Sequence, residues 1–132
     1  MNNDTNDRKA LTLAYLDAFS KQQFDRLETL LAPDLHFKGP IMTRTSAQDY
    51  IGALKRLSII HVRSDVRRVF VDGDEVCVIY DFVTDTAAGA LSTIEWLHFE
   101  GGRISAIDLY YDRLPWQSVM ETIAQRAAQP AA

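Results

Sequence analysis

Hydrophobic residues in the first third of the chain recur at helical spacing. Near the start, one predicted helical face is formed by Leu11, Tyr15, Ala18 and Phe19, with Asn6 or Asp7 available as the N-cap. The segment 25–28 has the pattern of a capping box and predicts a short second helix that ends before Pro33. These two helices open the predicted fold.

A short extended segment separates the second helix from a third. Residues 35–38 alternate in the manner of a strand and are closed by Gly39 and Pro40. Ser46 then suits the N-cap of a third helix, whose apolar face carries Tyr50, Ile51, Leu54 and Leu57. The first half of the chain is therefore predicted to be mainly helical.

From residue 61 onward, β-branched and aromatic residues predominate. They form four runs, 61–71, 75–84, 90–99 and 103–112, separated by short segments rich in Gly, Asp and Ala. Pro115 suits the first turn of a closing helix with Trp116, Val119, Met120 and Ile123 on one stripe. The pattern predicts one α+β domain over residues 1–132, in which helices cover one face of a curved antiparallel sheet. Residues 1–6 and 127–132 are expected to be frayed tails.

Composition and charge narrow the possible partners. The chain has 132 residues, with 14 Lys and Arg against 18 Asp and Glu and a formal charge of −4. Nucleic acids and anionic membranes need a concentrated basic face, so neither is expected as a partner. The N-terminal segment lacks the basic and apolar runs of a signal peptide, and charges interrupt every hydrophobic run, which predicts a cytoplasmic protein.

The Gly101-Gly102 pair predicts the register of the last hairpin. A two-residue loop there places Glu95 directly opposite Asp108, with Leu97, Phe99 and Tyr110 on the same face and Asp112 further along it. Neighbouring buried carboxyls tend to share a proton, which raises one pKa towards the range used in acid–base catalysis. The alternative is a solvated pair at a sheet edge, bonded to Arg63, Arg67 or Arg113.

The same register predicts that the opposite sheet face is also apolar. That face would carry Ile94, Trp96, His98, Ile107, Leu109 and Tyr111. A solvated sheet face should be polar, so we expect a second copy of the chain to cover this one and form a homodimer.

Histidines and aromatic residues supply the remaining candidates. His36 lies near the expected pocket mouth and has a pKa suited to proton shuttling, although strand alternation can turn it towards solvent. The spacing of His36, His61, His98 and Cys77 matches no metal motif, so we expect no metal and no cofactor. Several aromatic residues can line a pocket or fill the core, namely Phe19, Phe37, Tyr50, Tyr80, Tyr110 and Trp116.

The element order resembles the NTF2-like superfamily, which includes ketosteroid isomerases, limonene-epoxide hydrolases and SnoaL-like polyketide cyclases. The resemblance covers nearly the whole chain and rests on the segments 14–19, 30–37, 96–104 and 108–112. It implies a cone-shaped fold with a curved sheet wrapped around N-terminal helices. It does not specify the reaction, because one scaffold hosts many functions.

Taken residue by residue, the resemblance is uneven. Tyr15 falls where the isomerases place a tyrosine that donates to the dienolate oxygen, and Glu95 falls where they place a protonated aspartate. The position of their general base is Gly39 here, which disfavours a plain ketosteroid isomerase. Asp112 is similar to the acid–base aspartate of SnoaL-like cyclases. The strand 90–99 has no Arg-x-Asp, so the full set of hydrolase residues is not visible.

Two classes of function follow from these residues. The first is a cofactor-free enzyme that performs isomerisation, cyclisation or hydrolysis on a small apolar steroid-, terpenoid- or polyketide-like compound. Its catalytic candidates are Tyr15, Glu95, Asp108, Asp112 and His36, and Leu97 and Phe99 join the aromatic residues as substrate contacts. The alternative is a non-catalytic ligand-binding or dimerisation module of the same fold.

Overall fold

The computed structural model describes residues 2–129, which form four helices and six strands. In chain order these are α1 (Asn2–Ser20), α2 (Phe24–Leu30), β1 (Leu31–Lys38), β2 (Thr43–Arg44), α3 (Ala47–Leu57), β3 (His61–Asp72), β4 (Glu75–Thr84), β5 (Ala90–Glu100), β6 (Arg103–Tyr110) and α4 (Arg113–Ala128). The strands make one open, curved sheet in the order β2-β1-β6-β5-β4-β3. The predicted α+β class is therefore confirmed.

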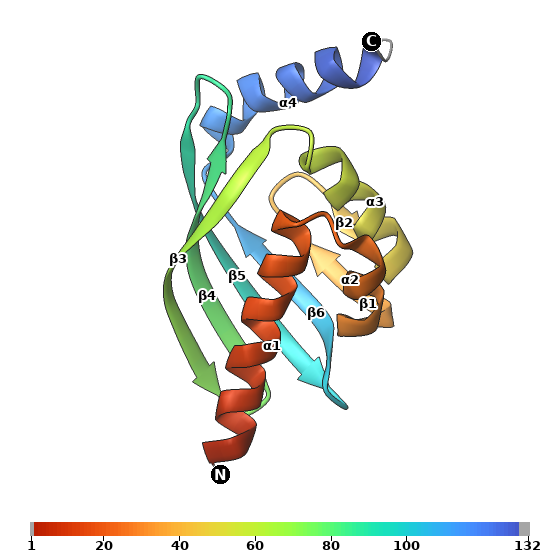
Figure 1. Ribbon diagram of the computed structural model, residues 1–132, viewed down its shortest axis with the longest axis vertical. Helices are drawn as coiled ribbons and strands as arrows, with labels where there is room; N and C mark the ends of the chain where they lie inside the picture. Colours follow the sequence, from red (N-terminus) through yellow and green to blue (C-terminus); the bar gives the residue numbers. More distant parts are fainter. Residues whose placement is uncertain (1, 130–132) are drawn as a thin grey trace.

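The helices lie on the concave side of this sheet. Figure 1 shows α1 running along the sheet, α2 and α3 beside it, and α4 across one end. Strand β4 alternates strictly between buried and half-buried residues, and β5 alternates almost as regularly, so one face of each points at the helices. This face and the helices enclose a core that includes Leu27, Leu35 and Val78, all fully buried.

Several element boundaries differ from the prediction. Helix α1 begins at Asn2, so an N-cap at Asn6 or Asp7 is wrong. Helix α2 begins at Phe24 without a side-chain cap, whereas Ser46 caps α3 as predicted by accepting from the Asp49 amide. Residues 2–6 of the predicted tail continue α1 in the backbone, while Met1 and residues 130–132 lie outside the described residues.

The sheet is mixed rather than wholly antiparallel. Strand β1 is longer than predicted and pairs in parallel with β6, while all other neighbouring strands are antiparallel. The short strand β2 pairs with the end of β1, and this pairing sets Arg44 opposite Phe37. Strand β1 of the parallel pair lies beside α3, and Arg44 of β2 lines the cavity described below.

A β-bulge at Ser105 changes the predicted register of β5 and β6. The two-residue turn itself is confirmed, since Gly101 and Gly102 have φ values of 56° and 80° and Glu100 pairs with Arg103. Beyond the turn, Phe99 pairs with Ile104 but His98 pairs with Ala106, which leaves Ser105 as an extra residue. The Ser105 hydroxyl donates to the His98 carbonyl at 3.2 Å. Every later β6 side chain is therefore on the opposite face from the one predicted.

The bulge moves Asp108 and Tyr110 out of the concave face. Glu95 pairs with Leu109, not with Asp108, and Asp108 lies beside Trp96 on the convex face. Tyr110 is 52% exposed there. Ile107 and Leu109, predicted for the outer face, instead point inward. The predicted carboxylate pair is therefore wrong, because a one-residue slip reverses the side-chain alternation.

Candidate functional site

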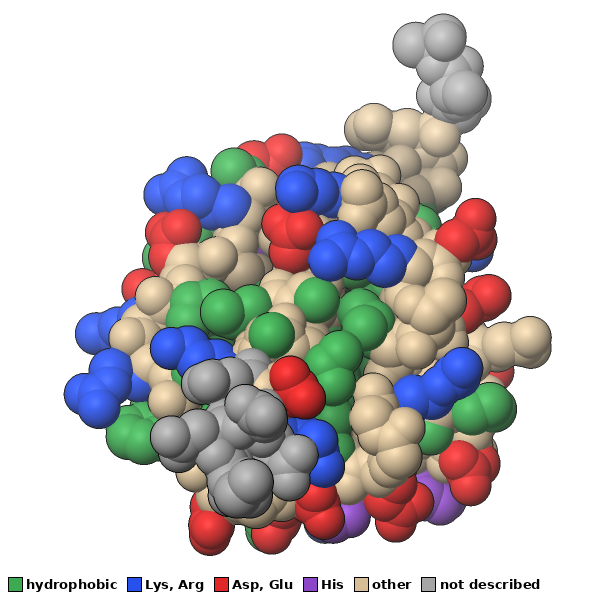
Figure 2. Space-filling model, turned by 60° about the horizontal axis from the view of Figure 1, so that its bottom comes forward, with side chains coloured by type: hydrophobic (Ala, Val, Ile, Leu, Met, Phe, Trp, Pro, Cys, Tyr) green, Lys and Arg blue, Asp and Glu red, His purple; other side chains and the backbone are tan. Residues whose placement is uncertain are grey.

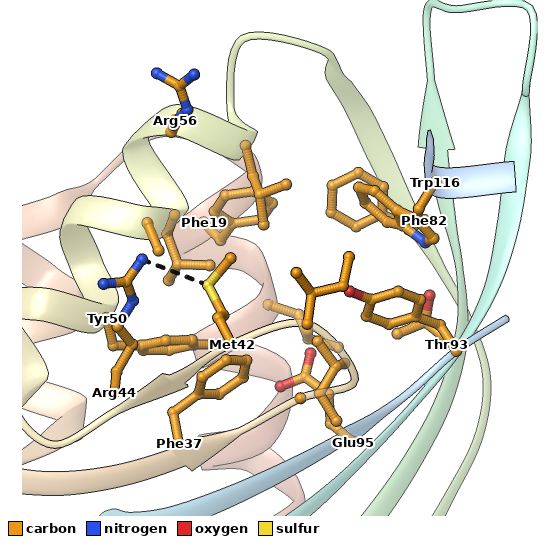
Figure 3. A pocket seen from close by; sticks show the side chains of 18 of the residues that line it. Phe19, Phe37, Met42, Arg44, Tyr50, Arg56, Phe82, Thr93, Glu95 and Trp116 are labelled. Atoms are coloured by element: carbon orange, nitrogen blue, oxygen red, sulfur yellow. Dashed lines mark hydrogen bonds between the residues drawn. The ribbon is translucent and has the colours of Figure 1, made fainter. Parts of the chain in front are cut away.

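A cavity of about 300 Å³ opens between the helices and the concave sheet face. Most of its lining is apolar. Its polar side chains are Tyr15, Arg44, Tyr50, Arg56, Tyr80, Thr93, Glu95 and Tyr111. Figure 3 shows Glu95 on one wall, with Phe37 and Met42 on one side and Phe82 and Trp116 on the other. Among the described lining residues, Glu95 supplies the sole carboxyl group.

Glu95 is reached by tyrosines from separate elements. Tyr15 of α1 donates to Glu95 Oε1 at 2.7 Å, and Tyr80 of β4 donates to Oε2. Tyr50 of α3 is hydrogen-bonded to the Tyr15 hydroxyl. Because Tyr15 already donates to the carboxylate, Tyr50 acts as the donor to Tyr15. Tyr15 and Glu95, the two residues that the resemblance to the isomerases assigned to one site, are therefore in direct contact.

The local fold explains why these groups meet. Tyr80 pairs with Thr93, two residues before Glu95 on the same face, so its ring reaches diagonally to the carboxyl. Tyr15 lies one helical turn before Phe19, and both face the core. The Phe37 ring packs against Tyr50 with a centroid distance of 4.6 Å, which orients the Tyr50 hydroxyl towards the others.

Burial controls the protonation of this cluster. Glu95 is only 3% exposed, and this burial raises its pKa, while the hydrogen bonds from Tyr80 and Tyr15 lower it in part. Burial and the neighbouring Glu95 charge raise the pKa of Tyr15 and of Tyr80 well above the ordinary value. The tyrosines therefore remain neutral donors, and Glu95 is the group of this cluster that can exchange a proton.

The other predicted acid–base residues lie outside this cluster. Asp112 is exposed and caps α4 by accepting from the Leu114 amide at 3.0 Å. His36 is exposed on the outward side of β1, as strand alternation allows. Neither residue nor Asp108 lines the cavity. The prediction that Asp108 and Asp112 share a face with Glu95 is wrong, and for His36 the structure shows the outward orientation that strand alternation left open.

The predicted substrate contacts divide into two groups. Phe19, Phe37, Tyr50, Tyr80 and Trp116 line the cavity. Leu97 and Phe99 are buried deeper in the core, and Tyr110 lies on the convex face, so none of these three lines it. The alternation of β5 explains why Leu97 and Phe99 are buried without lining the cavity. They follow Glu95 on the same face of the strand but lie further from the cavity.

Sequence reasoning missed two features of the site. It considered Tyr50 and Tyr80 only as aromatic rings that line a pocket or fill the core, although their hydroxyls belong to the hydrogen-bonded cluster. The register of β4 against β5 is the signal that would have identified Tyr80. It also missed Arg44 and Met42, which line the cavity from the β1–β2 segment. A two-residue strand leaves no periodic pattern in the sequence.

His61 is packed between cavity-lining aromatic rings and makes stability depend on pH. Its ring lies 4.6 Å from those of Phe19 and Phe82. The pKa of His61 is lowered to about 4, because the effect of burial exceeds that of a hydrogen bond to the Arg63 backbone, which raises the pKa. The unfolded chain then binds this proton more readily than the folded chain, so stability is full above about pH 6.5 and falls towards pH 4.

We expect His61→Phe to remove part of this acid destabilisation. Urea unfolding at pH 7 and pH 4.5 measures the free energy of unfolding for both proteins, and the loss between the two pH values should be smaller for the variant. Glu95 acts in the opposite direction, because its raised pKa favours the folded state as the pH falls. That contribution is common to both proteins and cancels in the comparison. An equal loss in both would contradict the prediction.

No helix within residues 2–129 is long and apolar enough to cross a membrane. Figure 2 shows acidic and basic side chains interspersed around a group of hydrophobic side chains near the centre of the visible face.

Comparison with solved structures identifies the same fold in proteins of several activities. A protein of Sinorhizobium meliloti assigned as a polyketide cyclase has a TM-score of 0.71 and 17% identity, covering 76% of this chain and 94% of that one. A protein of Kribbella flavida assigned as a ketosteroid isomerase has a TM-score of 0.72 and 19% identity, covering 81% and 78%. An LEH-like epoxide hydrolase of M. tuberculosis has a TM-score of 0.72 and 15% identity, covering 94% and 98%.

These identities establish a common fold and leave the reaction open. No curated protein matches the sequence. A family model does match, and it is that of the SnoaL-like domain over residues 12–107, most of the chain. The open curved sheet, the enclosing helices and this match agree with one another, and the chain belongs to the SnoaL-like family within the NTF2-like fold.

Proposed function

We propose that the protein is a cofactor-free enzyme that moves a proton on carbon, with Glu95 as its single acid–base group. The observation that carries this proposal is the buried Glu95 carboxyl, which opens onto an apolar cavity and accepts hydrogen bonds from Tyr15 and Tyr80. An ionised carboxyl in such a place is a stronger base than in water, because burial disfavours its charge.

One carboxyl favours isomerisation or cyclisation over hydrolysis. In the proposed step the Glu95 carboxylate takes a proton from a carbon next to a carbonyl, and the C–H electron pair moves into an enolate. The carboxylic acid then returns the proton to another carbon. Alternatively, the enolate carbon attacks a carbonyl carbon of the same molecule, the C=O π electrons move to its oxygen, and the carboxylic acid gives its proton to that oxygen. Both reactions need one group that accepts a proton and later donates it. Water activation by a pair of carboxyls finds no second acid among the described lining residues.

The cavity indicates the kind of substrate. Its volume of about 300 Å³ is at the lower end of ordinary ligand sites, and aromatic rings such as Phe19, Phe82 and Trp116 form much of its wall. We therefore propose a compact, largely apolar carbonyl compound of the terpenoid, steroid or polyketide kind.

Hydrogen exchange on a test ketone examines the proposal directly. β-Tetralone, which has an acidified C–H beside its carbonyl, is incubated with the protein in deuterium oxide, and loss of the proton signal is followed by NMR. We expect the protein to accelerate deuterium uptake above the rate in buffer. Binding of β-tetralone without accelerated uptake would contradict the enzymatic proposal.

A binding module of the same fold is the second candidate. It is favoured by the closed hydrogen bonding of the cluster, in which Tyr50, Tyr15, Glu95 and Tyr80 satisfy one another. Such a cluster can stabilise the fold without chemistry. The exchange experiment separates the two, because only an enzyme increases the exchange rate.

We further propose that the convex sheet face joins two copies of the chain. Its exposed apolar side chains include Ile94, Trp96 and Tyr110, which are 38%, 45% and 52% exposed. Phe70 of β3, which pairs with Cys77 next to Trp96 and is 48% exposed, extends this apolar area. Exposed apolar area of this extent is typical of an interface.

Trp96→Glu is expected to convert the dimer to monomers, because it places a charge at the centre of the apolar face. Sedimentation velocity at micromolar concentration measures the change, and Leu114→Glu is the matched control, since Leu114 is 71% exposed on α4. A monomeric wild-type protein would refute the proposed dimer.

A further inference from the structure

Arg44 is the cationic side chain that the fold directs towards the cavity. It pairs with Phe37 across β1 and β2, and directly opposed residues of antiparallel strands point to the same face. Phe37 is buried and lines the cavity, and Arg44 lines it as well. In Figure 3 the Arg44 guanidinium lies beside Met42 at the side of the cavity.

The Arg44 guanidinium has one weak hydrogen-bond acceptor among the described residues. Its Nε is buried and donates to nothing in the part of the chain that the structure describes. One Nη donates to the Met42 sulfur at 3.6 Å, and a thioether is a weak acceptor. By contrast, Arg8 and Arg126 each lie 2.7 Å from an aspartate oxygen. Within residues 7–129, no carboxylate lies within 4.0 Å of Arg44.

A half-buried cation without a counter-ion is costly unless a ligand supplies the anion. We propose that Arg44 binds an anionic oxygen of the substrate, either a carboxylate or an ionised enol, while the apolar body of the substrate fills the cavity. This inference rests on the proposed function and narrows its substrate class to compact acidic carbonyl compounds. The planar guanidinium suits such groups, because two of its N–H donors can bind one anionic group.

Arg56 provides a natural comparison. It also lies at the cavity edge, but it is exposed on α3, and Figure 3 shows its guanidinium directed away from the cavity. Loss of either arginine changes the net charge equally. A difference between the two variants therefore reports the local contact and excludes a general effect of protein charge.

Calorimetry with matched ligands tests the inference. The first pair is naphthoate and naphthamide, which share shape but differ in charge, and the second is dimedone, whose enol is ionised at neutral pH, and neutral cyclohexanone. We expect the wild-type protein to prefer at least one anion over its neutral partner. Arg44→Met should reduce that preference roughly 10- to 100-fold, as expected for loss of a hydrogen bond to a charged group.

Two further variants keep the result interpretable. Arg56→Met should retain the wild-type preference, and Arg44→Lys should retain part of it, since the charge stays but the two-pronged contact is lost. Thermal unfolding of each variant checks that the fold is intact. A preference for naphthoate alone assigns a carboxylate, and a preference for dimedone alone assigns an ionised enol; either supports the inference.

The inference is overturned if the wild-type protein prefers neither anion, if Arg44→Met leaves the preference unchanged, or if Arg56→Met lowers it equally. These outcomes differ from failure of the proposed function. Deuterium uptake by neutral β-tetralone in the wild-type protein tests the proton transfer alone, whereas the ligand pairs test charge recognition alone.

Discussion

Glu95→Gln is expected to slow deuterium uptake by β-tetralone roughly 100- to 10,000-fold relative to the wild-type protein. The amide has nearly the shape of the carboxyl and can still accept a tyrosine hydrogen bond, but it cannot take a proton from carbon. Since Glu95 is the sole carboxyl among the described lining residues, no neighbour is placed to replace it. NMR exchange rates at pH 7 measure the effect.

Glu100→Gln is the matched control for this experiment. Glu100 is the last residue of the same strand β5, but it is exposed and lies beside the Gly101-Gly102 turn, away from the cavity. The Glu100→Gln variant should catalyse deuterium uptake by β-tetralone at the wild-type rate. If Glu95→Gln retained the wild-type rate while folding normally, the observed exchange would have another origin, and the assignment of Glu95 would be wrong.

Tyr15→Phe is expected to lower the free energy of unfolding by about 1–3 kcal/mol, measured by urea unfolding. The variant removes the donor to Glu95 Oε1 and also the partner of the buried Tyr50 hydroxyl. Leaving buried polar groups unpaired costs more than the loss of one hydrogen bond alone. The same change should raise the pKa of Glu95 further, because the Tyr15 hydrogen bond lowers it. The pH at which exchange reaches half its maximum should therefore rise.

A double variant shows whether the tyrosines act as a connected set. Tyr50→Phe combined with Tyr15→Phe removes both hydroxyls, so no unpaired Tyr50 group remains. We expect the double variant to lose less stability than the sum of the single variants, with a coupling of about 0.5–3 kcal/mol. Additive losses would show that Tyr50 and Tyr15 do not depend on each other.

The sequence predicted the fold and the centre of the site because both rest on strong periodic patterns. Helical spacing placed Tyr15 beside Phe19 on the buried face of α1, and strict alternation placed Glu95 on the buried face of β5. These two patterns are independent, and the resemblance to the ketosteroid isomerases implied that the two residues, 80 positions apart, share one site.

The failures have a different cause, since each depends on one irregular position. The bulge at Ser105 carries no sequence signature, because a serine fits a regular strand equally well, and it reversed the predicted faces of Asp108 and Tyr110. The inward direction of Arg44 depends on a two-residue strand, which is too short to show any period. Local irregularity of this kind becomes visible only when the partner strand is known.

The Ser105 bulge has a consequence for how such a pocket can change during evolution. Most substitutions in β6 alter one side chain, but a change that removes the bulge and lets Ser105 pair with His98 exchanges the two faces of the strand beyond it. Regular pairing of this kind would bring Asp108 opposite Glu95 and turn Leu109 outward. A pocket with one acid would thereby acquire two, without any new acid being introduced. In this scaffold, the presence of a bulge is thus a heritable variable that can redistribute existing acids between surface and interior.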